Sequence, residues 1–210
     1  EAVRIALRYR TPVILLSDGY LANGTEPWLL PDLDALPDIS VEYASGTNAL
    51  NEDGEPVFWP YMRNDDLARP WAIPGTDDLM HRIGGIEKEE GTGNISYDPE
   101  NHGRMVDIRE ARINKVAESY PATEVVGDVD GDILIVGWGS TWGAITGAAG
   151  RMRRDGRRIA HVHLRNLHPF PDDLGEIVKG YDHVLVPEMN LGQLSALLRA
   201  KYLVDAKVIA

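Results

Sequence analysis

A glycine-rich turn, Gly137-Trp-Gly-Ser-Thr-Trp-Gly143, is the candidate binding motif of this sequence. It follows the apolar run 132–136, and a glycine turn between a strand and a helix points backbone amides at phosphate groups. The match to a dinucleotide fingerprint is poor, because the third glycine falls one place late and Trp138 and Trp142 stand where the backbone would approach a ligand. The next strand also ends in Arg165 rather than in an acid. A plain strand-to-helix turn is the favoured interpretation, and binding of a phosphorylated nicotinamide is the alternative.

Polar residues at the carboxyl ends of two predicted strands are candidates for a crevice or an interface. Glu188 follows the last β-rich run, and Asn190 is its expected partner as the N-cap of the last helix. Asp18, Tyr20 and Asn23 lie in a glycine-containing loop that closes the first apolar run. Ligands of open α/β sheets sit at this edge. A plain turn is the alternative for the first loop.

Two histidines, His161 and His163, alternate along a predicted strand, so both side chains project from one face, as a metal pair requires. No carboxylate or third histidine stands at ligand spacing, so we predict no metal site. The sequence also lacks Ser-His-Asp, Walker and Gly-x-Ser-x-Gly patterns. We therefore assign no catalytic, cofactor-binding or metal-ligating residue.

Three short β-rich runs, 132–136, 157–164 and 183–189, are each followed by a turn and a helical pattern. Strands that alternate with helices predict an α/β domain with a parallel sheet and flanking helices over residues 131–210. The expected helices cover residues 141–154, 172–179 and 192–202.

The chain opens in a helical pattern, and residues 11–18 form an apolar run that predicts a strand. A buried parallel strand needs neighbours on both sides, and no earlier run supplies them. We therefore expect residues 1–30 to be the end of another domain, and the chain to be part of a longer protein.

Residues 31–130 differ in composition from both ends. Eight of the thirteen prolines fall between Pro27 and Pro99, and aromatic residues cluster from Phe58 to Trp71. This pattern predicts an ordered, loop-rich connecting segment. Asp98, followed by Pro and Glu, starts a helix that should run to about residue 120. Residues 121–130 are expected to be an acidic linker that holds the domain boundary.

Charge and composition exclude several classes of function. Residues 32–107 hold seventeen acidic and five basic residues, which accounts for the whole net charge of −12 and argues against nucleic acid as a partner. The chain has no apolar stretch long enough to cross a membrane. It contains no cysteine, which excludes disulfides and any iron–sulfur cluster held by these residues. We expect a cytoplasmic protein.

Five segments together resemble the α subunit of 2-oxoacid:ferredoxin oxidoreductases, in particular the 2-oxoglutarate type. The segments occur in the family's order and span nearly the whole chain: 11–24, 87–102, 137–143, 164–171 and 186–194. Relatives that act on pyruvate or branched 2-oxoacids share this architecture, so the substrate is less strongly indicated than the family.

The resemblance implies an enzyme that uses thiamine diphosphate and Mg²⁺ to decarboxylate a 2-oxoacid. It passes electrons singly through [4Fe–4S] clusters to ferredoxin, and it transfers the acyl group to coenzyme A. By this likeness, residues 1–30 end the pyrimidine-binding domain, and residues 131–210 are similar to a transketolase C-terminal domain.

The same likeness places the catalytic groups elsewhere. The carboxylate that activates the pyrimidine and the residues that clamp the substrate are expected before residue 1, and the pyrophosphate and magnesium site on the β subunit. We therefore expect no cofactor bound by these residues, which would serve structural and interface roles. The implied partners are the β subunit, the N-terminal part of the α subunit and, through the complex, ferredoxin. The alternative is a free-standing α/β regulatory domain that binds a nucleotide or coenzyme A at residues 137–143.

Overall fold

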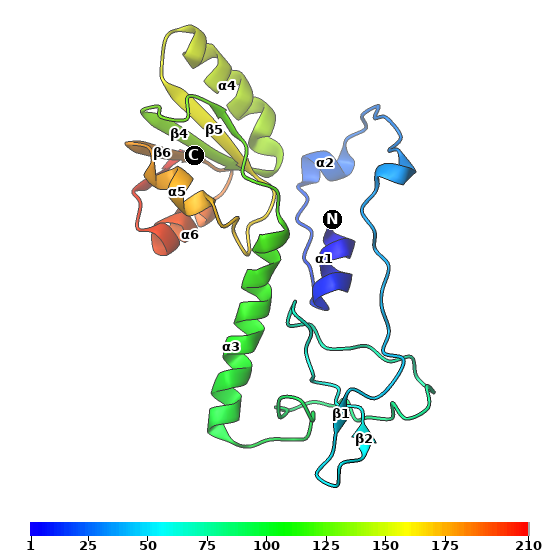
Figure 1. Ribbon diagram of the computed structural model, residues 1–210. Helices are drawn as coiled ribbons and strands as arrows, with labels where there is room; N and C mark the ends of the chain where they lie inside the picture. The colour runs from blue at the N-terminus through cyan, green and yellow to red at the C-terminus, as the bar shows by residue number, and fades with distance from the viewer. Residues whose placement is uncertain (210) are drawn as a thin grey trace. The chain divides into compact units, whose positions relative to one another are not determined.

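The computed structural model describes residues 1–209, which form two compact units (Figure 1). The first unit contains residues 1–15 and 29–116. The second contains residues 16–28 and the chain from residue 117 onward. No helix among the described residues is both long and apolar enough to cross a membrane.

A five-stranded sheet is the centre of the second unit. Its strands are β3 (Val125–Gly127), β4 (Ile133–Trp138), β5 (Ile159–Leu164), β6 (His183–Pro187) and β7 (Ala206–Ile209). Their order in the sheet is β3-β5-β4-β6-β7. All neighbouring pairs are parallel except β3 and β5, which are antiparallel.

Helices cover both faces of this sheet (Figure 1). Successive residues of β4 point to opposite faces, as a strand requires. Leu134 and Val136 are buried in a core with residues of α5 (Leu174–Lys179) and α6 (Gln193–Tyr202). Ile135 packs on the other face against residues of α4 (Trp142–Arg154). The predicted α/β class and its flanking helices are therefore confirmed.

The parallel arrangement predicted for the strands now labelled β4, β5 and β6 is confirmed, but β3 adds an antiparallel edge strand to the sheet. This short strand lies inside the expected linker and pairs antiparallel with β5 through Val126 and His161. Five residues separate β3 from β4. A parallel crossover needs about a dozen residues or more, so the chain must enter β4 from an antiparallel edge strand. The sheet is mixed.

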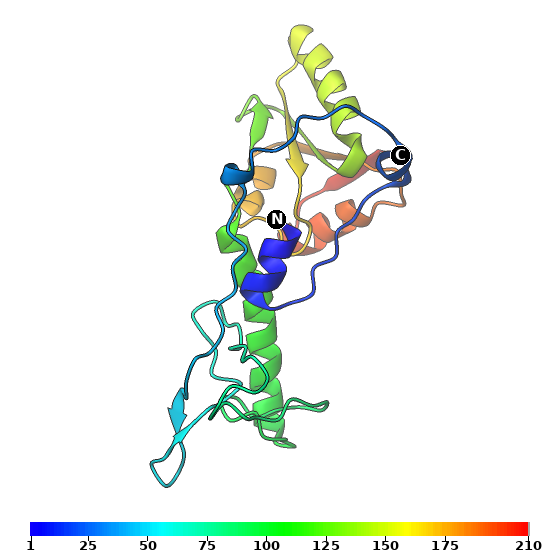
Figure 2. The same cartoon turned by 90° about the vertical axis from the view of Figure 1, so that its right-hand side faces the viewer.

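The first unit has little regular structure. Its elements are α1 (Ala2–Tyr9), the 3₁₀ turn η1 (Leu33–Ala35), the two-residue antiparallel strands β1 (Ala49–Leu50) and β2 (Pro56–Val57), and α3 (Pro99–Lys115). Figure 2 shows α3 as its longest element, beside loops without regular structure. The loop-rich character predicted for this segment is confirmed.

Asp98 starts α3 as predicted. Its carboxylate accepts a hydrogen bond of 2.9 Å from the amide of Glu100, and Pro99 takes the first helical position, where no amide hydrogen is needed. The helix continues into the 3₁₀ turn η2 (Val116–Ser119), so the predicted helix near residues 98–120 is confirmed.

The strand predicted at residues 11–18 does not form. Residues 12–18 have no regular structure, and the side chains of Ile14 and Leu15 are 83% and 80% exposed. A β-strand is stabilised by pairing with a neighbour, and no strand of the described residues pairs with this run. Its apolar composition predicted burial, but these side chains are exposed among the described residues.

Candidate functional site

The carboxyl ends of β4, β5 and β6 lie at one edge of the sheet, because the three strands are parallel neighbours. The glycine-rich turn leaves β4 at this edge through the 3₁₀ turn η3 (Gly139–Thr141) into α4. A side chain at Gly137 would clash with Ile145 of α4. The need for close packing of the strand and helix therefore explains this glycine without a bound phosphate.

Glu188, at the end of β6, is buried and fully engaged. Its carboxylate accepts hydrogen bonds from the amides of Leu194 and Ser195, at 2.9 and 3.2 Å, and from the Trp138 indole at 3.3 Å. Burial alone would raise the pKa of Glu188, but these bonds outweigh it and hold the pKa below its usual value. The ionised carboxylate therefore accepts hydrogen bonds from free amides at the N-terminus of α6 and stabilises that end of the helix.

Asn190 joins the same network. Its side-chain amide donates to Glu188 at 3.1 Å, and its carbonyl oxygen accepts from the amides of Gly192 and Gln193 at 2.8 and 3.0 Å. The predicted partnership of Asn190 with Glu188 is confirmed, but the predicted N-cap position is wrong, because Gly192 is the N-cap of α6. A crevice-facing or interface role for either residue stays a prediction.

The loop after residue 17 reaches the glycine-rich turn. Asp18 caps the short helix α2 (Gly19–Asn23) by accepting from the amide of Leu21 at 2.9 Å. Hydrogen bonds from Ser140 and then from Leu21 lower the pKa of Asp18. Two motifs more than a hundred residues apart in sequence therefore meet at the carboxyl edge of the sheet.

The other two residues predicted in this loop have different surroundings. Asn23 donates to the carbonyl of Gly19 at 2.8 Å, within α2. The Tyr20 side chain is exposed, as is its neighbour Leu21. Their proposed interface role is untested and stays a prediction.

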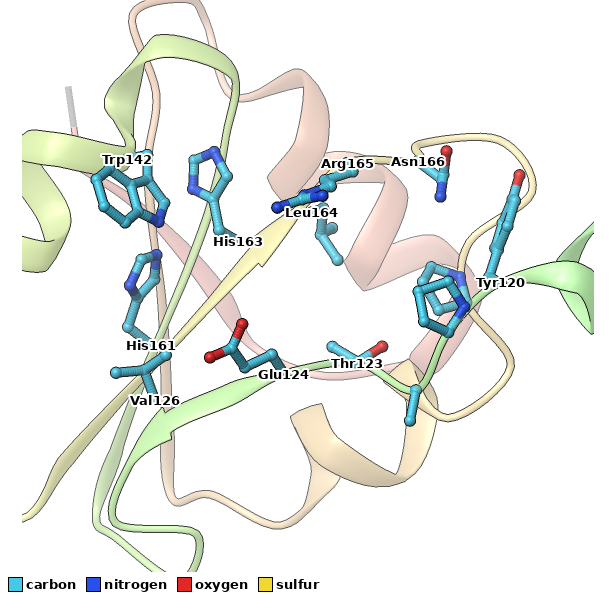
Figure 3. A pocket seen from close by; sticks show the side chains of 13 residues that line it. Tyr120, Thr123, Glu124, Val126, Trp142, His161, His163, Leu164, Arg165 and Asn166 are labelled. Atoms are coloured by element: carbon cyan, nitrogen blue, oxygen red, sulfur yellow. The ribbon is translucent and has the colours of Figure 1, made fainter. Parts of the chain in front are cut away.

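A pocket of about 480 Å³ opens beside β5 on the face that carries α4 (Figure 3). In that view His161, His163 and Trp142 lie at one end and Tyr120 and Asn166 at the other, with Arg165 and Glu124 between them. The pocket is lined by residues of β5, of the segment that enters β3, and of the first turn of α4: Tyr120–Glu124, Val126, Trp142, His161, His163–Asn166 and Pro171.

The two histidines project from the same face of β5, with ring centroids 5.7 Å apart. Burial, then the neighbouring His163 and Arg153, lowers the pKa of His161 to about 4. Burial also lowers the pKa of His163, against a hydrogen bond to Gly139 that raises it. Among residues 1–209 no group of three or more His, Cys, Asp or Glu side chains could hold a metal ion.

Four polar lining residues were not among the predicted site residues. Thr123 and Glu124 fell in the expected linker, and only the pairing of β3 with β5 brings them to the pocket. Arg165 and Asn166 directly follow a parallel strand, the same position that singled out Glu188. A position directly after a parallel strand was therefore a sequence signal for both residues.

The second unit is an α/β domain whose mixed sheet carries helices on both faces. Residues 131–207 match the family model described as pyruvate:ferredoxin oxidoreductase core domain II. The whole chain is 51% identical to the 2-oxoglutarate oxidoreductase subunit KorA of Mycobacterium tuberculosis, and covers 31% of that protein. Along its whole length the chain is similar to a part of the α subunits of 2-oxoacid:ferredoxin oxidoreductases.

Two more distant relatives show the same similarity to this enzyme family. The α subunit of 2-oxoacid:ferredoxin oxidoreductase 2 of Aeropyrum pernix is 32% identical over 95% of the chain, which again covers 31% of the relative. The solved 2-oxoglutarate:ferredoxin oxidoreductase of Magnetococcus marinus, with 2-oxoglutarate, coenzyme A and succinyl-CoA bound, matches 98% of the chain with a TM-score of 0.85 and 31% identity. The chain covers 35% of that structure's chain, so it spans about a third of the proteins it resembles.

Ligand groups for two of the cofactors implied by the resemblance are missing among the described residues. The chain has no cysteine to ligate an iron–sulfur cluster. The described residues also offer no carboxylate cluster for the Mg²⁺ that would hold a diphosphate. No step of the reaction is assigned to residues of this chain.

Proposed function

We propose that this chain is part of the α subunit of an enzyme that converts 2-oxoglutarate, coenzyme A and oxidised ferredoxin to succinyl-CoA, CO₂ and reduced ferredoxin. One observation carries the proposal: the similarity to enzymes of 2-oxoglutarate runs along the whole chain, and is not confined to the shared domain at residues 131–207. The proposal includes a cytoplasmic location, which imaging of a fluorescent fusion of the full-length protein tests.

Within this enzyme we assign structural and interface roles to these residues, and place thiamine diphosphate, Mg²⁺ and the iron–sulfur clusters on other parts of the complex. Large apolar side chains exposed at the carboxyl edge support an interface. Met189 and Leu191 after β6 are almost fully exposed, and Trp142, Tyr20 and Leu21 are more than half exposed. We propose that the β subunit or the N-terminal part of the α subunit covers them.

Activity of the full-length α subunit purified with its β subunit tests the reaction. We expect reduction of ferredoxin, or of a viologen dye, that requires both 2-oxoglutarate and coenzyme A. Preference for pyruvate would overturn the substrate but leave the family intact. Turnover by residues 1–210 alone would overturn the assignment of catalysis to other parts of the complex.

Two matched substitutions test the interface. Leu191→Asp puts a charge on the carboxyl edge, and we expect loss of most of the β subunit during affinity purification, with activity at least about tenfold lower. Leu203→Asp is the control, since Leu203 is similarly exposed but ends α6 in a left-handed conformation that Asp accepts. Equal recovery of the β subunit and equal activity with both variants would contradict an interface at this edge.

A further inference from the structure

Large apolar side chains recur at every third position of residues 29–43, a segment of the first unit. Every residue from 29 to 40 is exposed. The four recurring side chains are exposed by 87% at Leu30, 75% at Leu33, 53% at Leu36 and 51% at Ile39. Such a row of apolar side chains in water marks a surface that another molecule covers.

The backbone places this row on one side of the segment. A 3₁₀ turn and a polyproline II helix both have three residues per turn, so residues three apart face the same way. Leu33 begins η1, and Leu36 after it has φ −71° and ψ 143°, in the polyproline II region. Pro31 and Pro37 have φ fixed near about −65° and hold the residue before each of them in an extended conformation. The four side chains therefore form one apolar stripe.

The segment is attached to the first unit at its end and not along the stripe. Its hydrogen bonds among the described residues are local up to residue 41, as where Asp32 accepts from the amide of Asp34 at 3.1 Å. Hydrogen bonds to other elements begin at Glu42, whose carbonyl accepts from Arg10 at 3.1 Å. After η1 the segment runs as an extended chain (Figure 1). The stripe is thus presented to solvent from an anchored end.

The charge of the segment indicates what covers the stripe. Residues 29–43 contain no basic residue and four acidic ones, Asp32, Asp34, Asp38 and Glu42. Carboxylates beside an apolar row are complementary to an apolar groove with lysine or arginine at its rim. Charge of one sign speeds the encounter of separate molecules, whereas tethering already holds a segment of the same chain at high effective concentration. The charge therefore favours another subunit as the occupant.

We propose that residues 29–43 dock in an apolar groove of the β subunit, with the apolar stripe in the groove and the carboxylates on a rim of lysine or arginine. This inference rests on the proposed function, which supplies the β subunit as a partner. An extended segment fixed by prolines loses little conformational freedom on binding. The surface differs from the carboxyl edge of the sheet, because its residues belong to the first unit.

Photo-crosslinking in the full-length α subunit, purified with its β subunit, identifies the occupant. Benzoylphenylalanine replaces Leu33 in the stripe or, as the control, Leu50, which is more than half exposed in β1 of the same unit. We expect position 33 to join a β-subunit peptide that contains lysine or arginine, and position 50 to give no such product. A crosslink from position 33 to the α subunit, in its own or a second copy, would overturn the proposal. So would no crosslink, or an equal yield from both positions.

An apolar variant measures the contribution of the stripe. Leu33→Ser combined with Leu36→Ser should weaken the affinity of the α subunit for the β subunit at least about tenfold, the usual cost of truncated interface anchors. Leu50→Ser is the matched control and should leave the affinity unchanged. All three positions are exposed, so folding should be retained. Wild-type affinity for the double variant would refute the docking surface.

A charge variant measures the contribution of the rim. Asp32→Asn combined with Asp38→Asn keeps an acceptor for the local hydrogen bonds, and should slow association about threefold or more at low salt but not at high salt. Glu52→Gln with Asp53→Asn removes the same charge from the exposed turn between β1 and β2, and is the control. Equal association rates for the two double variants would contradict a basic rim. Turnover of 2-oxoglutarate by the wild-type complex is measured separately, so a failed proposed function is distinguished from a failed docking surface.

Discussion

Each of the two units is stabilised internally by a different kind of interaction. The second unit buries two apolar clusters on the two faces of one sheet, and its strands supply their own hydrogen-bond partners. The first unit has two-residue strands, one long helix and many loops, and its segments are tied by ion pairs and by arginines stacked on aromatic rings. Regularly spaced apolar residues are therefore needed to predict a fold from the sequence. A segment without such a pattern can still be ordered, through ion pairs and ring contacts.

Arginine shows the difference most clearly. In the first unit Arg8 forms a two-pronged ion pair with Asp66, with distances of 2.9 and 3.0 Å, and Arg10 stacks on Trp71. Burial, and then other arginines nearby, lowers the pKa values of Arg10 and Arg63. These side chains add to the contacts of the few buried apolar residues in this unit, such as Tyr9, Phe58 and Met105. The stability of this unit should therefore depend on charge, and that of the second unit on packing.

Truncation of a core leucine should give the largest contrast. Leu134→Ala leaves a cavity in a central strand and should lower the free energy of unfolding by about 3–4 kcal/mol, whereas Leu29→Ala in the first unit removes an exposed side chain and should change it by less than about 0.5 kcal/mol. Urea denaturation followed by circular dichroism measures both. Similar losses for the two variants would contradict the division between packing and charge.

Removal of the buried Glu188 carboxylate at the start of α6 should give the second largest loss of stability. Glu188→Ala leaves the Trp138 indole and the amides of Leu194 and Ser195 without their acceptor, at a cost of about 3 kcal/mol. The matched control is Glu176→Ala on the exposed side of α5. Thermal unfolding of both variants measures the difference. A shift no larger than that of the control would mean that water replaces the carboxylate.

Acid should loosen the second unit first. The folded pKa of His161 is about 4, below the ordinary value of 6.5, so the unfolded state binds the proton more tightly between these two values. Stability should be complete above pH 6.5 and should fall by at most about 3 kcal/mol as the pH drops to 4. Denaturation midpoints across this range, with His161→Leu as the control that flattens the slope, measure the effect.

The first unit should respond at lower pH and more weakly. Hydrogen bonds from Arg109, and then from His102, lower the pKa of Glu87 from 4.5 to about 2 against the opposing effect of burial. Its contribution is present above pH 4.5 and lost as the pH falls toward 2. Solvent screening should reduce it to about 1 kcal/mol. If the first unit lost stability before the second, between pH 6 and 5, the expected order would be contradicted.

The smallest effect is expected at a helix cap. Asp98→Ala removes the acceptor for the Glu100 amide at the start of α3 and should lower the free energy of unfolding by about 1 kcal/mol. Asp107→Ala, at an exposed position within the same helix, serves as the control. Hydrogen exchange at the first turn of α3 reports the change directly. Unchanged protection there would show that Pro99 alone is sufficient to start the helix.

Prediction from the sequence succeeded where local patterns and tertiary contacts agree. Apolar runs followed by turns located β4, β5 and β6, and the Asp98-Pro99 pair located α3, because strands, helices and caps leave short-range signals. It failed at β3, whose three residues carry no pattern and exist as a strand only because β5 offers an edge. It failed in the opposite way at residues 11–18, where an apolar run has no partner in the described chain.

The candidate sites divide in the same manner. The partnership of Glu188 and Asn190 could be predicted, since both lie within one short turn after a strand. The meeting of Asp18 with Ser140, and of Glu124 with Arg165 in one pocket, could not, because each depends on contacts between distant segments.

The sequence by itself determined the α/β class, the absence of cysteine ligands, the concentration of negative charge in one segment and the likeness to one enzyme family. Only the tertiary structure decided the direction of the edge strand, the burial of Glu188 and the pocket around His161 and His163. The physical reason is range: periodicity, capping and composition are properties of neighbouring residues, whereas a pocket exists only where segments far apart in the chain pack together.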